Sequence, residues 1–133
     1  MVSHTGLRSV CDSNRNLSDD QVRRIAQAGG IIGIGFWPEV NCGQGIDPIV
    51  KSLRRAIEVA GVDHVALGSD WDGFVSTAID ASGVGFLTGS LLKQSFTEEE
   101  VRKLMGENAI QLHLNFARFK FNLASGTLLC SCL

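Results

Sequence analysis

Residues 29–36 read GGIIGIGF and residues 61–70 read GVDHVALGSD, and these two stretches decide the fold class. Each contains a short run that is apolar on both faces, which is typical of a parallel strand buried on both sides. Glycine stands directly before each run, where it commonly ends a helix. The two stretches therefore predict two strands of a parallel sheet, each preceded by a helix.

Three helix starts are predicted around these strands. The first helix opens near Ser18, with acidic residues in its first turn that complement the helix dipole. The second opens at Asp47, an N-cap candidate, because Pro48 suits the first helical position, where no N–H is needed. The third opens with a capping box in which Thr97 is the cap and Glu100 reaches back to it.

The order of these elements predicts an α/β architecture with a parallel sheet. Residues 1–3 add a possible strand end, residues 70 to about 95 are predicted to be a loop, and Gly106 is expected to interrupt the third helix. A closed (β/α)₈ barrel needs roughly 250 residues, whereas this chain has 133. We therefore expect part of a larger domain.

Composition excludes several functional classes. The chain has 12 Lys+Arg against 14 Asp+Glu and a net charge of -2, so it offers no basic surface for nucleic acid. It has no apolar stretch long enough to cross a bilayer and no secretory signal, so we expect a cytoplasmic protein without a membrane partner. Cys11, Cys42, Cys130 and Cys132 lack the paired spacing of a zinc site, and we expect free thiols in a reducing compartment.

Candidate functional residues cluster where the predicted strands end, which is where α/β folds place their sites. The imidazole of His4 could bind a metal, or His4 could be an ordinary surface histidine. Asp70 and Asp72 would lie on one side if the strand continued, and the Asp70 carboxylate could accept a proton or hold an ammonium group. The alternative for this pair is a turn around Gly73. Arg15 could bind a carboxylate, or it could be solvated.

Five motifs occur in an order that resembles the renal (membrane) dipeptidase family: SHTG at 3–6, RNLSD at 15–19, GGIIG at 29–33, GSDWDG at 68–73 and MGENA at 105–109. The similarity runs from about residue 2 to about residue 112, with Trp71 where the family usually has Phe. The resemblance implies that residues 1–114 are the last two to three β/α units of a (β/α)₈ barrel, and that residues 115–133 are an unmatched tail.

The resemblance also implies a function, the hydrolysis of dipeptides by a water that two zinc ions activate. His4 would then be a metal ligand, Arg15 would hold the C-terminal carboxylate of the substrate, and Asp70 would lie near the nucleophile and the substrate's amino group. The family's other metal ligands belong upstream of His4, so we expect an incomplete zinc site and no activity from this chain alone.

Two alternatives remain open. The chain could be an inactive truncated product, or a half-barrel that associates with itself or with a complementary chain through exposed sheet edges. It could also derive from another amidohydrolase-type enzyme that acts on cyclic amides. Arg15 favours the dipeptidase over the second alternative, because a guanidinium suits the carboxylate of a peptide terminus.

Overall fold

A computed structural model describes residues 1–124, with side chains as far as residue 117. It contains a three-stranded sheet in the order β1-β2-β3, with β1 at Val2–Thr5, β2 at Ile32–Ile34 and β3 at Val65–Leu67. Both neighbouring pairs are parallel, and Ile34 lies opposite Thr5 on one side and Leu67 on the other. The α/β prediction is confirmed, and the strand end expected at residues 1–3 belongs to a whole strand, β1.

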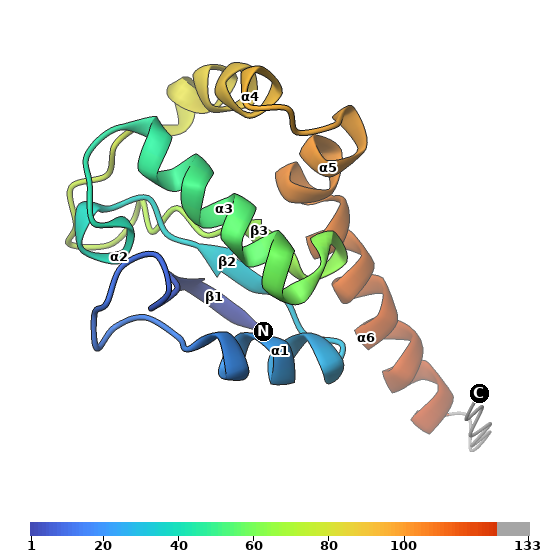
Figure 1. The fold of residues 1–133 in the computed structure, drawn as a ribbon. Coiled ribbons are helices and arrows are strands. Elements are labelled where there is room, and N and C mark those ends of the chain that lie inside the picture. Colours follow the sequence, from blue (N-terminus) through green and yellow to red (C-terminus); the bar gives the residue numbers. More distant parts are fainter. Residues whose placement is uncertain (125–133) are drawn as a thin grey trace.

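Helices pack against the sheet, and α3 crosses in front of it in the view of Figure 1. Their bounds are α1 Asp19–Gln27, α2 Pro38–Asn41, α3 Ile46–Ala60, α4 Val84–Lys93, α5 Glu98–Arg102 and α6 Asn108–Ala124, with short helical turns at Val62–His64, Ala81–Gly83 and Lys103–Glu107. No helix within residues 1–124 combines the length and the apolar character that crossing a membrane requires.

Two of the three predicted helix starts are confirmed, and one is displaced. Ser18 caps α1 and Thr97 caps α5, each in a reciprocal capping box. The start predicted at Asp47 is wrong, because α3 begins at Ile46 with Gly45 as its cap. The carboxylate of Asp47 instead accepts a hydrogen bond from the side-chain nitrogen of Gln94 at 3.1 Å.

The loop predicted over residues 70 to 95 is also wrong in its second half, where α4 forms. Leu87 and Leu91 stand one helical turn apart and are completely buried in the core. Gly85 and Gly89 weaken the helical pattern of this segment, and the burial of the two leucines outweighs that preference. The interruption expected at Gly106 is confirmed, since its φ of 159° is not helical.

The core lies between the sheet and the helices α1, α3, α4 and α5. Ile32, Ile34 and Val65 project from the sheet into it, and Val22 of α1 and Leu53 of α3 pack there with no exposed surface. Because side chains alternate along a strand, Gly33 and Ala66 face the opposite side of the sheet.

A β-bulge in β1 decides which face His4 occupies. Val2 pairs with Ile32 and Thr5 pairs with Ile34, so three steps along β1 match two steps along β2. Because β1 has one residue more than β2 over this stretch, Val2 and Thr5 both point to the core side of the sheet although they are three residues apart. His4 is the neighbour of Thr5 and therefore points to the face opposite the core. A regular strand starting from the same Val2 pairing would direct His4 into the helical layer.

Two glycines allow β1 to curl over this opposite face. A Cβ added at Gly33 would lie 2.1 Å from the backbone oxygen of Ser3, and a Cβ added at Gly68 would lie 2.3 Å from the same oxygen. Gly68 directly follows β3, yet its missing Cβ would also lie 3.0 Å from the Cα of His4, across the intervening strand β2. The sheet is therefore strongly curved at the ends of its strands.

Candidate functional site

The carboxyl ends of the three parallel strands meet at one edge of the sheet and carry the predicted site residues. His4 lies in β1, Arg15 lies in the connection that follows β1, and Asp70 follows β3. The segment after β2 contributes Trp37, the N-cap of α2. This placement agrees with the general rule that α/β folds build their sites at this edge.

His4 is half-buried on the face opposite the core. Its ring lies 5.8 Å from the ring of Trp37 in an edge-on arrangement, with 62° between the two planes. Its Nδ1 is 2.9 Å from the hydroxyl of Ser3. One ring nitrogen is thus engaged locally, and Nε2 remains the nitrogen that a ligand could use.

Arg15 is exposed and lies beside the same indole ring. Its Cζ is 5.8 Å from the centroid of the Trp37 ring, a distance within the range of a cation–π interaction. Its backbone is anchored from β1, because the hydroxyl of Thr5 donates to the carbonyl oxygen of Arg15 at 3.3 Å. The structure therefore brings His4 and Arg15 together through a shared partner, Trp37.

Asn16 ties the loop that carries Arg15 to the segment that carries Trp37. Its side-chain nitrogen donates to the carbonyl oxygens of Cys11 at 2.8 Å and Val40 at 2.9 Å. The side chain is buried, and its Oδ1 has no partner among the described residues. A side chain at Gly6 would begin 2.3 Å from the Val40 oxygen and 2.6 Å from this Oδ1, so glycine is required there.

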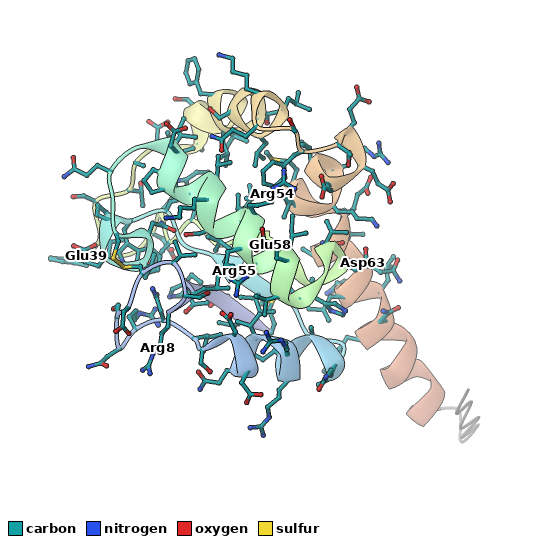
Figure 2. All side chains as sticks on the ribbon, viewed as in Figure 1. Arg8, Glu39, Arg54, Arg55, Glu58 and Asp63 are labelled. Carbon is teal, nitrogen blue, oxygen red and sulfur yellow. A yellow bond between two sulfur atoms is a disulfide. The ribbon has the colours of Figure 1, made fainter. Side chains whose placement is uncertain are left out.

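The prediction of free thiols is wrong for two of the four cysteines. Cys11 and Cys42 form a disulfide, with their Cα atoms 5.2 Å apart across 31 residues of sequence. Their spacing gives no indication of pairing, because the fold alone brings the two loops together. The bond lies beside Glu39 (Figure 2), whose carbonyl oxygen is 3.5 Å from Cys11 Sγ. Cys130 and Cys132 lie outside the described residues.

The disulfide also removes the basis for the reducing compartment expected from the sequence, since stable disulfides are rare in the cytosol.

Asp70 follows β3, and among the described residues it forms no hydrogen bond or ion pair with His4 or Arg15. The strand β3 ends at Leu67, and residues 70–73 form a turn in which Gly73 N donates to Asp70 O at 3.0 Å. Asp70 has a φ of 61°, and its carboxylate oxygens lie 2.6 and 2.9 Å from where a Cβ of Gly73 would stand. Among the described residues its carboxylate forms no hydrogen bond and no ion pair. Of the two alternatives that the sequence left open for Asp70 and Asp72, the structure shows the turn around Gly73.

The described residues do not fit a complete metal centre. A structural or catalytic zinc ion requires three or four protein ligands. Within the part of the chain whose side chains are described, no group of three or more His, Cys, Asp or Glu could hold a metal ion. His4 is thus a single potential donor.

A charged network holds the start of α1 against α3. Arg55 Nη2 donates to Asp19 Oδ2 at 2.5 Å, and the hydroxyl of Ser9 donates to Asp19 Oδ1 at 2.7 Å. Figure 2 shows Arg55 and Glu58 on α3, and their side chains form a second ion pair of 3.0 Å. The Ser9 hydrogen bond, followed by the contacts with Arg55, lowers the pKa of Asp19 below its ordinary value, although partial burial acts in the opposite direction.

Trp37 lies outside the five sequence motifs, yet it contacts both His4 and Arg15. The signal that could have identified it is Gly35, two residues earlier. A Cβ at Gly35 would lie 2.2 Å from the Trp37 ring, so the indole covers the backbone of that glycine. Trp71, in contrast, packs edge-on against Phe36 with ring centroids 5.8 Å apart.

A hollow of about 570 Å³ lies on another part of the surface, beside Cys42. Its walls include Asp47, Pro48 and Lys51, and none of the predicted site residues lines it. We therefore do not assign it to the site.

Two comparisons place the chain among known sequences. The family model for membrane dipeptidases (peptidase family M19) matches residues 1–122. An uncharacterized protein from the pqqA 5' region of Klebsiella pneumoniae is 29% identical over 124 residues, which make up 86% of this chain and 46% of that protein. The chain thus spans about half the length of this curated relative.

Solved structures show the same fold. A metallo peptidase from Rhodobacter sphaeroides, liganded with a phosphinate mimic of the dipeptide L-Ala-D-Ala, is 30% identical with a TM-score of 0.75, over 82% of this chain and 34% of that one. The probable dipeptidase PvdM from Pseudomonas aeruginosa has a TM-score of 0.73 over 81% of this chain and 42% of its own, at 18% identity, and shows the fold alone. The resemblance seen in five sequence motifs is confirmed. The chain belongs to the membrane dipeptidase family, peptidase family M19.

Proposed function

We propose that this chain carries the carboxylate-binding side and one metal ligand of a metallodipeptidase site, built on the last two to three β/α units of a (β/α)₈ barrel. The observation that carries the proposal is the shared contact of His4 and Arg15 with Trp37. It supports a single site at the edge of the sheet where the parallel strands end.

Arg15 would bind the C-terminal carboxylate of a dipeptide. The side chain is exposed, and it forms no ion pair among the described residues, so its N–H groups are available for a planar carboxylate. The bound L-Ala-D-Ala mimic in the Rhodobacter sphaeroides enzyme supports a dipeptide with a free carboxyl terminus as the substrate class.

His4 would contribute one nitrogen to a zinc centre, and Asp70 would exchange a proton or hold the substrate's amino group. When bound, two zinc ions would supply an activated water. The described residues do not fit that whole centre, so we derive no step through the metal. Asp70 follows β3 in a turn with Gly73, and among the described residues its carboxylate has no hydrogen-bond or ion-pair partner, which leaves it free for either role.

We further propose that the chain alone does not hydrolyse dipeptides, since one imidazole cannot hold a catalytic zinc ion. The boundary predicted after residue 114 stays a prediction, and α6 runs through it from Asn108 to Ala124. The predicted lack of nucleic-acid and membrane partners also stays a prediction. So does the predicted cytoplasmic location, against which the disulfide between Cys11 and Cys42 argues.

The test has two parts, both with the purified chain. Release of free alanine from L-Ala-D-Ala in the presence of added zinc should be undetectable, and activity that a chelator abolishes would overturn the proposed inactivity. Binding of the same dipeptide, followed by NMR titration, should be weak but measurable in the unchanged chain. It should be lost in Arg15→Met and retained in Arg24→Met, which removes an exposed arginine from α1. Equal binding by both variants would overturn the role of Arg15.

A second candidate function is that of a half-barrel that associates with itself or with a complementary chain. The observation that favours it is the sheet itself, in which β1 and β3 are both outer strands. Such edges present unpaired backbone groups that can pair with another chain. Size-exclusion chromatography with light scattering should show a dimer or larger species, and a monomer at all concentrations would contradict this candidate.

A further inference from the structure

We infer that Trp37 is a positioning residue for Arg15: the indole, which also contacts His4, holds the guanidinium in the orientation that receives a carboxylate. The inference rests on the proposed function and deepens it, because it assigns to a residue outside the five motifs the task of orienting the substrate-binding group. Three structural features support it: the rigid position of the indole, its two contacts, and the otherwise free guanidinium.

The indole of Trp37 is held rigidly. The side chain is only 4% exposed, and it lies against Gly35, where even a methyl group would begin 2.2 Å from the ring. The buried side chain of Asn41 donates to the carbonyl oxygens of Gly35 at 2.8 Å and Trp37 at 3.2 Å. Pro38 follows as the first residue of α2 and restricts the backbone further. The ring therefore has little freedom to move.

The same ring lies on the side of the sheet that His4 occupies. Ile34 projects into the core, so Gly35 faces the opposite side, and the indole that covers Gly35 lies there too. The β-bulge in β1 directs His4 to this face. Trp37 thus meets the imidazole of His4 and the guanidinium of Arg15, each at 5.8 Å.

The guanidinium of Arg15 has no competing anchor in the described part of the chain. Thr5 holds the backbone of Arg15, but no hydrogen bond or ion pair holds its side-chain nitrogens. An arginine that lies on an aromatic ring keeps its N–H groups free for a planar, bidentate ligand. Fixing a side chain before binding reduces the entropy that binding costs, so loss of the indole should weaken carboxylate binding without removing the charge that binds.

The experiment uses the full chain with Trp71→Phe, which leaves Trp37 as the sole tryptophan because the sequence contains two. The probe is N-acetylglycine, and N-acetylglycinamide, which lacks the carboxylate, serves as the matched control ligand. An NMR titration gives the dissociation constant, and the Nε–H resonance of Arg15 reports the ring current of the nearby indole.

Trp37→Leu should weaken N-acetylglycine binding by roughly two- to fivefold, as expected for an exposed cation–π contact, and should abolish the ring-current shift of Arg15. Trp37→Phe, which keeps an aromatic face, should restore most of both. Binding of N-acetylglycinamide should be undetectable in every variant.

Two results separate this inference from the proposed function. If Arg15→Met abolishes binding while Trp37→Leu leaves it unchanged, the inference is overturned and the carboxylate clamp stands. If Arg15→Met has no effect on binding, the clamp itself fails. If Trp37→Leu does not fold, the Trp71→Phe chain still decides the matter, because an Arg15 Nε–H resonance without an upfield shift would overturn the inference.

Discussion

The disulfide between Cys11 and Cys42 joins the loop that carries Arg15 to the segment that carries Trp37. It acts in parallel with Asn16, whose side chain bonds to the backbone of both segments. Two connections of different chemistry thus hold together the loops that follow β1 and β2. The disulfide and Asn16 hold the loop of Arg15 next to the segment of Trp37. The side chain of Arg15 forms no hydrogen bond among the described residues that would hold the two segments together.

Breaking this disulfide should destabilise the whole chain. The bond closes a loop of 31 residues, and the loss of unfolded-state entropy for a loop of this length corresponds to about 3–4 kcal/mol. Cys42→Ser should therefore lower the free energy of unfolding by up to that amount, measured by urea denaturation. The double variant Cys11→Ser/Cys42→Ser provides the control, because a reductant should no longer change its midpoint. An unchanged midpoint on reduction of the parent chain would show that the bond is not formed in solution.

Gly33→Ala should destabilise the sheet. A methyl group at this position would begin 2.1 Å from the backbone oxygen of Ser3, and backbone atoms cannot move aside as the end of a side chain can. Overpacking of this kind costs about 1–3 kcal/mol. Gly89→Ala is the matched control: nothing lies within 4 Å of its missing Cβ, and alanine in a helix should stabilise α4 by up to about 1 kcal/mol. Thermal melts of both variants should therefore shift in opposite directions, and a shift in the same direction would contradict the curvature described for β1.

Asn108→Ala should loosen the start of α6 from β3. The buried side-chain nitrogen of Asn108 donates to the carbonyl oxygens of Val62 at 2.7 Å and Val65 at 2.8 Å. Its removal leaves these oxygens without that partner and should cost about 1–3 kcal/mol. Asn115→Ala alters an exposed residue on the same helix and should stay within about 0.5 kcal/mol of the parent. Equal effects of the two variants in chemical denaturation would argue against the Asn108 contacts.

The stability supplied by Asp19 should depend on pH in acid. The hydroxyl of Ser9 and the guanidinium of Arg55 favour the charged carboxylate, so the pKa of Asp19 in the folded chain lies below its ordinary value of 3.8. The resulting stabilisation is complete above that ordinary value and is lost as the pH falls through the lower folded pKa. Asp19→Asn should therefore be less stable than the parent at pH 7, and the difference should shrink as the pH falls below about 3.8.

Asp20→Asn is the control for this prediction, because Asp20 is exposed in the same first turn and lacks the contacts with Ser9 and Arg55. It should cost less stability at neutral pH than Asp19→Asn. A difference between the parent and Asp19→Asn that stays constant down to pH 2 would contradict the lowered pKa.

Local patterns predicted most of the elements. The capping boxes at Ser18 and Thr97 mark helix starts because the side chain and the backbone it satisfies are only three residues apart. The apolar runs predicted β2 and β3, although the structure shortens both, and residues 62–64 form a helical turn instead of a strand. His64, expected within that strand, uses its Nδ1 to reach the carbonyl oxygen of Gly30 at 2.8 Å.

The candidate site was predicted less completely. The motifs located His4 and Arg15, but nothing in the sequence showed that Trp37 lies against both, because the three residues come from different segments. For Asp70 the sequence left a continuing strand and a turn around Gly73 both open, and the structure shows the turn. The helix α4 was missed because its glycines lower helix propensity, while the burial of Leu87 and Leu91 that compensates for them depends on the fold.

What the sequence determined by itself was the α/β fold class, the helices capped at Ser18 and Thr97, and the family, since each depends on residues that are close along the chain. Only the tertiary structure decided that Cys11 pairs with Cys42 and that a bulge in β1 directs His4 to the face of the sheet opposite the core. It also decided that His4 and Arg15 both contact Trp37. Each of these depends on the separation in space of segments far apart in the chain, which only the packing of the sheet and its helices determines.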